Sequence, residues 1–266
     1  MTIETLFADD GELPPAIPAA TLVIFRNAPD GGPPQLLMVE RAASMRFAGG
    51  AAVFPGGRVD AADHALAAAL GATDDDSREE WAARIAAVRE TLEETGLAVG
   101  IDRQASLEEA RRARALLLEA GELAPVLAEF GWNLDLDALV PFSRWRPKHR
   151  EVRVFDTRFY LTDLGTGAVD LVVDATENTH LFWASAAEAL ELAEREQIKV
   201  IFPTRRNLER LAQFGDFAAA LTHVEQFPSM MITPFMEERE GERWLAIPEG
   251  VGYPVTGEPL QGAMRG

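Results

Sequence analysis

The order of the hydrophobic patterns along the chain restricts the fold more than any other feature of the sequence. Short apolar runs at 21–26, 35–40 and 51–54 predict strands, and a turn rich in Gly and Pro joins the first two as a hairpin. Apolar residues then recur at spacings of three and four across 77–95, which predicts an amphipathic helix. Ser77 and Glu80 fit a capping box at its start, and Gly96 fits its end.

Strands and helices follow in separate groups further along the chain. A helical region at 107–130 is interrupted near Gly121. The remaining patterns predict strands at 140–142, 152–162, 169–173 and 180–184, helices at 186–196, 204–214 and 217–226, and one strand, 243–247, in a Pro- and Gly-rich tail. Strands first, an inserted helix, strands again and then helices predict an α/β fold with a mixed sheet between helices.

Composition limits the partners of such a fold. The 266 residues carry a formal net charge of -18, so we expect no binding to nucleic acid or to an anionic membrane surface. Cysteine is absent, which excludes disulfides and thiolate chemistry and is compatible with a cytoplasmic location. Apolar runs are short and the first residues are acidic, so we expect neither a transmembrane helix nor a secretory signal.

Three carboxylates share one turn of the predicted helix. Glu90, Glu93 and Glu94 are three and four residues apart, so they project from the same face. Like charges at this spacing repel each other, whereas a hard divalent cation such as Mg²⁺ prefers carboxylate oxygens and would stabilise them. The pattern indicates either a metal site or a solvated acidic face.

The turn before this helix favours the metal site. Phe54-Pro55-Gly56-Gly57 closes a strand, and glycines there let backbone groups approach a metal or phosphate. Together with the segment from Arg89 to Leu97, this turn resembles the Nudix box, Gly-x5-Glu-x7-Arg-Glu-U-x-Glu-Glu-x-Gly-U, where U is aliphatic. Thr91 replaces the first U, and 18 extra residues separate the Gly from the Arg. Counted back from Arg89, the middle Glu of the box falls at Trp81.

Such a split box resembles the peroxisomal acyl-CoA diphosphatase branch of the Nudix hydrolases. The segment from Leu37 to Gly57 resembles the coenzyme A signature that precedes the box in this branch. Residues 144–147 and 155–160 resemble two further segments of the branch. The likeness covers about residues 20 to 215.

The resemblance implies a Nudix-type α/β/α sandwich with a mixed central sheet and helical insertions. We expect an N-terminal arm (1–18), a hydrolase domain (19–229) with insertions at about 58–80 and 101–138, and a C-terminal extension (230–266) packed on the domain. The implied reaction is hydrolysis of a diphosphate linkage with Mg²⁺ or Mn²⁺ as cofactor. The leading substrate is coenzyme A or an acyl-CoA, which would give 3′,5′-ADP and a 4′-phosphopantetheine species.

The resemblance also implies roles for individual residues. Glu93 and Glu94 are expected as metal ligands, Glu90 as a ligand or the general base, and the Gly56 carbonyl as a further ligand. Arg89 would brace the carboxylates and keep them ionised. The expected catalytic residues are Glu90, Glu93, Glu94, Arg89 and Glu177, the last as a water-orienting acid or second-metal ligand. The expected substrate-binding residues are Arg41, Arg46, Phe54, Gly57, Arg144, Arg146 and Lys148.

A basic cluster at 144–153 supplies three of these substrate-binding residues. In so acidic a chain it either grips a polyanion, since Arg binds phosphate bidentately, or pairs with neighbouring acids such as Glu151 and Asp156. Glu177 likewise either acts in catalysis or only ends a loop.

Other functions stay open. One is hydrolysis of ADP-ribose, NADH or a nucleoside polyphosphate, and another is a catalytically silent Nudix-like binding module. The sequence leaves the acyl-chain preference, the choice of metal, the number of metals, the general base and a homodimer undecided.

Overall fold

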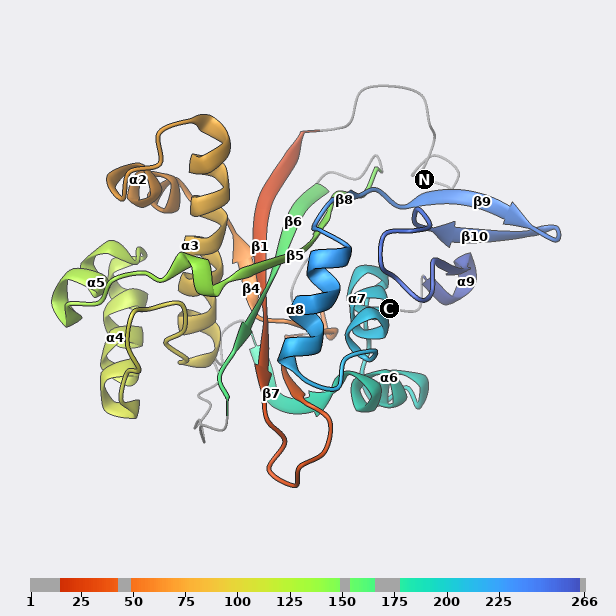
Figure 1. Cartoon of the computed structure of the whole chain (residues 1–266), viewed down its shortest axis with the longest axis horizontal. Coiled ribbons are helices and arrows are strands. Elements are labelled where there is room, and N and C mark those ends of the chain that lie inside the picture. The colour runs from red at the N-terminus through yellow and green to blue at the C-terminus, as the bar shows by residue number, and fades with distance from the viewer. Residues whose placement is uncertain (1–14, 43–48, 149–153, 166–177, 264–266) are drawn as a thin grey trace.

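A computed structural model describes residues 15–42, 49–148, 154–165 and 178–263. In this part of the chain, eight strands form one sheet (Figure 1). Its path runs β3-β2-β1-β6-β5-β8, with β4 paired to β1 and β7 paired to β2. The strands are β1 (Ala16–Arg26), β2 (Gln35–Arg41), β3 (Ala52–Val53), β4 (Gly56–Arg58), β5 (Val140–Trp145), β6 (Val154–Asp163), β7 (Asn178–Ser185) and β8 (Met231–Ile232).

The sheet is mixed, as predicted. Strand β1 runs parallel to β6 over ten residue pairs, and β5 runs parallel to β8. The described pairs of β1 with β2 and β4, of β2 with β3 and β7, and of β5 with β6 are antiparallel. One edge of β1 therefore receives β4 near its start and β2 near its end.

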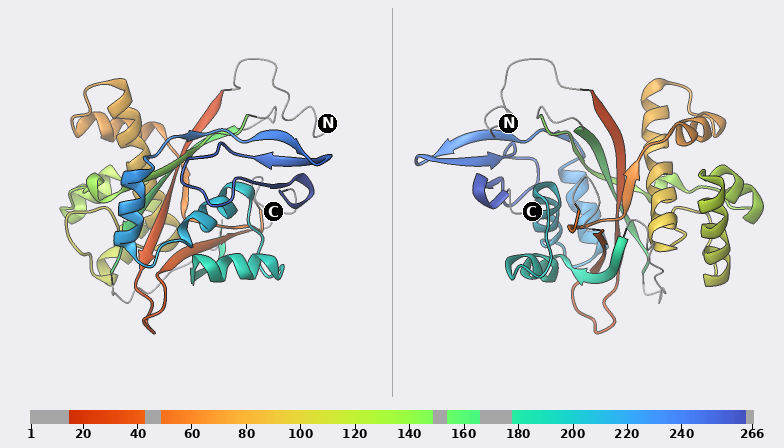
Figure 2. Two further views of the ribbon diagram at one scale, coloured as in Figure 1. Left: turned by 45° about the vertical axis from the view of Figure 1, so that its right-hand side comes forward. Right: turned by 180° about the vertical axis from the view of Figure 1, so that it is seen from behind.

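Helices cover both faces of the sheet (Figures 1 and 2). One face carries α2 (Ala61–Ala69), α3 (Asp75–Thr95), α4 (Leu107–Ala120), α5 (Ala124–Phe130) and the short η1 (Leu136–Ala138). The other carries α6 (Ala186–Glu194), α7 (Phe202–Leu211) and α8 (Phe217–Gln226). Each face packs a separate apolar core, so the predicted α/β/α sandwich is confirmed. No helix among the described residues is long and apolar enough to cross a membrane.

The segments that were predicted as insertions, 58–80 and 101–138, form helices on the α3 face of the sheet. Helix α2 lies within 58–80, and α4 with α5 lies within 101–138. In Figure 1 these helices stand outside α3, away from the sheet. Gly121 ends α4 in the left-handed conformation, at the predicted interruption.

The C-terminal tail is more ordered than the sequence indicates. In place of one strand it forms an antiparallel sheet of β9 (Phe235–Arg239), β10 (Glu242–Ala246) and β11 (Gly257–Pro259), followed by α9 (Leu260–Ala263). Tyr253 anchors the tail to the domain, because its hydroxyl donates to the Asn207 side chain at 2.7 Å and accepts from the Trp145 indole at 3.2 Å.

Several predicted boundaries are wrong by a few residues, and two of them have a visible cause. Strand β1 begins at Ala16, within the segment expected as an arm, because residues 16–25 pair with β6. Helix α3 is capped by Asp74, which shares a capping box with Ser77, so the expected box between Ser77 and Glu80 is absent. The predicted strand at 169–173 lies outside the described residues.

Candidate active site

Helix α3 carries the three acidic residues close to the sheet. Its inner side presents Ala82, Ala83, Ala86 and Ala87, all fully buried in the core beneath the helix. Such small side chains let the helix backbone approach β1 and β4. Gly96 ends the helix in the left-handed conformation that glycine adopts without strain.

Glu90 and Glu94 face the glycine turn at the start of β4. The Gly56 amide donates to Glu94 Oε2 at 2.9 Å. A Cβ atom at Gly57 would lie 2.3 Å from the Glu90 carboxyl group, so a side chain there would displace that group. A Cβ atom at Gly56 would lie 2.3 Å from the Ala20 carbonyl oxygen. The turn and the helix, 33 residues apart between Gly57 and Glu90, thus form one unit.

Arg89 is the positively charged residue that the acidic side chains of this unit surround. Its side chain is 4% exposed, and its guanidinium contacts Glu90 at 3.0 Å and Glu93 at 3.7 Å. The same group donates to the Arg58 carbonyl at 2.8 Å, which ties it to the end of β4. Burial by itself lowers the Arg89 pKa, but the hydrogen bond to Asp63 and the charges of Glu90, Asp63 and Asp60 outweigh it and raise the pKa above its ordinary value. Arg89 therefore contacts two of the three carboxylates that it was predicted to brace, and its role in catalysis stays a prediction.

Asp63 is a further member of this unit, and the sequence did not mark it. Its side chain is 1% exposed and binds Arg89 with both oxygens, at 3.1 Å and 3.0 Å. Counted back from Arg89, the middle acid of the box falls at Trp81, which instead packs in the core. Counted forward from Gly57, the sixth residue is Asp63. The extra residues thus lie between Asp63 and Arg89, and a forward count would have found the acid.

The three carboxylates differ in exposure. The Glu90 side chain is 16% exposed, that of Glu93 is 35% exposed, and residue Glu94 is 4% exposed. Burial, opposed by the charge of Arg89 and assisted by that of Glu93, raises the Glu90 pKa to about 7. Glu93 is therefore the most accessible of the three.

The oxygen atoms of these three carboxylates are suitable ligands for a hard divalent cation. Three carboxylates on one turn supply the oxygen ligands that Mg²⁺ and Mn²⁺ take in proteins. Among the described residues, however, no three acidic or histidine side chains are already gathered closely enough to hold a metal ion. The contact of Gly56 with Glu94 is made by its amide, so its carbonyl as a ligand stays a prediction.

A second arginine, from the segment at 101–138 that was predicted as an insertion, supports the end of α3. Arg114 of α4 is 9% exposed, and its Nε donates to the Glu93 carbonyl oxygen at 2.8 Å. This carbonyl belongs to the last turn of α3, where the helix itself supplies no partner. No sequence pattern marked Arg114, because its role depends on where α4 packs.

Among the described residues, the predicted substrate contacts differ in their surroundings. Arg144 binds Asp156 with two hydrogen bonds of 2.7 Å, so at this position the pairing alternative holds. Phe54 is 2% exposed in the core on the opposite face of the sheet, because its side chain points away from α3, and its role as a substrate contact was wrong. Arg41 ends β2, and Arg146 and Lys148 follow β5, all partly buried. Arg46 and Glu177 lie outside the described residues.

Comparisons with known proteins agree with this geometry. No protein-family model matches the chain. The chain is 28% identical over 290 residues to the acyl-coenzyme A diphosphatase NUDT19 of Gallus gallus, which covers 86% of this chain and 74% of that protein. The crystal structure of a NUDIX hydrolase from Alicyclobacillus acidocaldarius superposes with a TM-score of 0.66 at 27% identity, covering 78% of this chain and 96% of that one.

Proposed function

We propose that this chain, which belongs to the Nudix hydrolase superfamily and is a pyrophosphohydrolase, cleaves the diphosphate linkage of coenzyme A or an acyl-CoA. The proposal for the site rests on one observation. Gly56 and Gly57 pack against Glu90 and Glu94 as one unit. Arg89, held by Asp63, supports this unit. The substrate rests on likeness to a protein named as an acyl-coenzyme A diphosphatase and on the coenzyme A-like segment before the box.

Water adds across the linkage in this reaction. Its oxygen forms a bond to one phosphorus, the bridging oxygen leaves with the other, and 3′,5′-ADP and a 4′-phosphopantetheine species result. Glu90, Glu93 and Glu94 would hold Mg²⁺ or Mn²⁺, which supplies neutralisation of phosphate oxygens and activation of water when bound. Arg89 holds Glu90 and Glu93 in position, and Asp63 holds Arg89. Glu90 and Glu177 are our two candidates for the residue that accepts the water proton.

A substrate panel tests the proposal. The full chain is incubated with coenzyme A, octanoyl-CoA, 3′-dephospho-coenzyme A, ADP-ribose, NADH and ATP, each with Mg²⁺, Mn²⁺ or EDTA, and products are identified by mass spectrometry. We expect metal-dependent cleavage, fastest for the coenzyme A compounds. Faster cleavage of ADP-ribose, NADH or ATP would replace the coenzyme A substrate by that compound. An absence of turnover on every compound would favour a silent binding module.

Glutamine variants test the carboxylates in the same assay. E93Q and E94Q keep the side-chain shape but remove the charge, so we expect roughly a thousandfold slower turnover, about 4 kcal/mol of transition-state stabilisation. Mn²⁺ affinity, measured by calorimetry, should fall as well. E119Q, at an exposed position of α4, is the matched control and should behave as wild type. Rates near wild type in both E93Q and E94Q would show that this helix does not carry the chemistry.

A further inference from the structure

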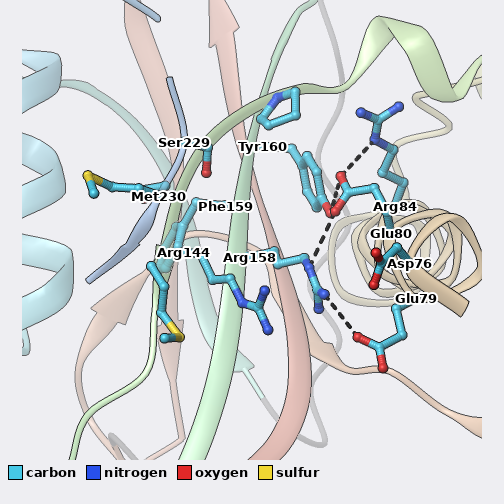
Figure 3. A pocket seen from close by; sticks show the side chains of 13 residues that line it. Asp76, Glu79, Glu80, Arg84, Arg144, Arg158, Phe159, Tyr160, Ser229 and Met230 are labelled. Carbon is cyan, nitrogen blue, oxygen red and sulfur yellow. Dashed lines mark hydrogen bonds and ion pairs between the residues drawn. The ribbon is translucent and has the colours of Figure 1, made fainter. Parts of the chain in front are cut away.

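A pocket of about 500 Å³ opens beside the N-terminal end of α3 (Figure 3). Helix α3 forms one wall with Asp76, Glu79 and Glu80, β5 and β6 form the floor, and Ser229 to Met231 form the far wall. Its volume is in the range of small-molecule sites in proteins. None of its lining residues belongs to the carboxylate unit described above.

Sheet register places this pocket on the same face as the carboxylates. Gly57 of β4 lies opposite Ala20 of β1, Ala20 lies opposite Arg158 of β6, and Arg158 lies opposite Arg144 of β5. Residues directly opposite one another point to the same face, and neighbouring strands are about 4.8 Å apart. The pocket floor at Arg158 and Arg144 is therefore about 10–14 Å across the sheet from Gly57, where Glu90 packs.

Helix α3 connects the same two places. Glu79 and Glu90 are eleven residues apart, which is close to three whole turns. They therefore lie on one side of the helix, roughly 16 Å apart along its axis. A ligand whose diphosphate lies at Glu90 would reach the pocket by running along α3.

The charges of the pocket exclude a phosphate group as its occupant. Arg144 is bound by Asp156 at 2.7 Å. Arg158 contacts Glu79 and Glu80, both at 3.3 Å, and Arg84 contacts Glu80 at 3.2 Å. A phosphate would have to displace these carboxylates from their arginines, next to a wall that carries Asp76 as well.

The same lining suits an uncharged chain with polar groups. Carboxylate oxygens and guanidinium N–H groups offer both acceptors and donors, which amides require. Opposite them, Met230 and Met231 are 53% and 44% exposed and add an apolar surface. Methionine adapts its shape to the apolar group that it meets.

We infer that this pocket receives the pantetheine arm of the substrate, with its acyl thioester end against Met230 and Met231. The inference rests on the proposed function, since pantetheine is the amide-containing, uncharged part of an acyl-CoA. It assigns the nucleotide and diphosphate to the carboxylate end of α3 and the acyl group to the other end.

Binding of a fragment tests this directly. S-octanoyl-pantetheine lacks the nucleotide and the diphosphate, so its binding to the metal-free full chain, measured by calorimetry, reports on the pocket alone. M231W fills the pocket from its far wall and should weaken binding at least tenfold. L118W, at an exposed position of α4, is the control and should bind as wild type. Equal binding by wild type and M231W, or no binding by wild type at millimolar fragment, would overturn the assignment.

Hydrolysis separates this inference from the proposed function. M231W should raise the KM for octanoyl-CoA about tenfold while its kcat stays near wild type. Failure of the wild-type chain to cleave any coenzyme A compound would refute the proposed function, whatever the fragment does. Cleavage with an unchanged KM in M231W would refute only the pocket assignment.

Discussion

The two faces of the central sheet bury arginine in opposite electrostatic surroundings. On the α3 face, Arg89 is 4% exposed and contacts four acidic side chains, two of them in the acidic cluster on α3. On the other face, Arg210 of α7 is 2% exposed, and it donates to the carbonyl oxygens of Phe142 and Phe227 at 3.1 Å each. The rings of Phe142 and Tyr253 flank its guanidinium.

The pKa shifts of the two arginines differ in sign for the same reason. Acidic neighbours raise the Arg89 pKa in spite of burial, whereas burial lowers the Arg210 pKa. An arginine among carboxylates gathers negative charge at one place, which is useful for holding a cation. An arginine among carbonyls and rings joins α7 to β5 and to the end of α8. Arg89 therefore belongs to a charged site, whereas Arg210 connects elements of the fold.

Replacing each arginine by methionine should have the largest effect. R89M leaves Asp63 buried without its cation, which costs about 3–5 kcal/mol of unfolding free energy, and should also abolish hydrolysis. R210M leaves two carbonyl oxygens without a donor but packs well, so we expect a loss of about 1–2 kcal/mol with hydrolysis intact. Urea unfolding and kcat give both quantities.

The double variant R89M/D63L sharpens this result. Removing both buried charges should restore most of the stability, whereas hydrolysis should stay lost because Glu90 and Glu93 keep no brace. Recovery of both properties together would mean that Arg89 acts only in folding.

The pH dependence of the unfolding free energy tests Glu209, which precedes Arg210 on α7. Burial raises the pKa of Glu209 on α7 to about 7, with Arg206 and Arg205 opposing it, and its Oε2 is buried without a partner. The folded protein thus holds this proton more tightly than the unfolded chain, whose pKa is 4.5. The stability from this group is fully present below about pH 4.5 and declines as the pH rises to about 7.

The variant E209Q has no carboxyl group at this position, so its unfolding free energy should not show that decline with pH. Relative to E209Q, wild type should lose on the order of 3 kcal/mol of unfolding free energy between pH 5 and 8. Urea unfolding at both pH values measures the difference, with E119Q as an exposed control. Parallel pH profiles for wild type and E209Q would contradict the raised pKa.

The smallest effect is expected from the brace on α4. R114M leaves the Glu93 carbonyl without its donor, which should cost about 1 kcal/mol and lower kcat roughly tenfold with little change in KM. R114K should recover part of kcat, and the exposed R111M serves as control. If R114M lowers stability but leaves kcat unchanged, α4 supports only the fold.

The sequence predicted elements well where one hydrophobic period ran without interruption. Helix α8 was predicted with its observed bounds, and Gly96 ends α3 as expected. In the tail, the strand predicted at 243–247 corresponds to β10, whereas β9 was missed because it is short and charged and lacks the alternation that identifies a half-buried strand.

The site was predicted only as far as its residues are close in sequence. Glu90, Glu93, Glu94 and Arg89 share one helical turn, and their spacing together with the resemblance to the Nudix box singled them out. Asp63 and Arg114 reach that turn from α2 and α4, through packing that no local pattern encodes. For Arg144 the sequence left two alternatives, binding of a polyanion or pairing with acids such as Asp156, and packing brings that carboxylate against it.

The parallel pairing of β1 with β6 has a consequence for how the protein forms during synthesis. Each of the ten residue pairs joins positions whose numbers differ by 138, from Ala16 with Val154 to Phe25 with Asp163. The edge of β1 that faces β6 must therefore wait for a partner made much later, and its backbone groups stay unpaired until then. Helices α3, α4 and α5 are complete earlier and depend on nearby contacts. We expect translation to produce a helical intermediate in which β1 is paired with β4 and β2 but open on its other edge, which is when a chaperone would protect this chain from aggregation.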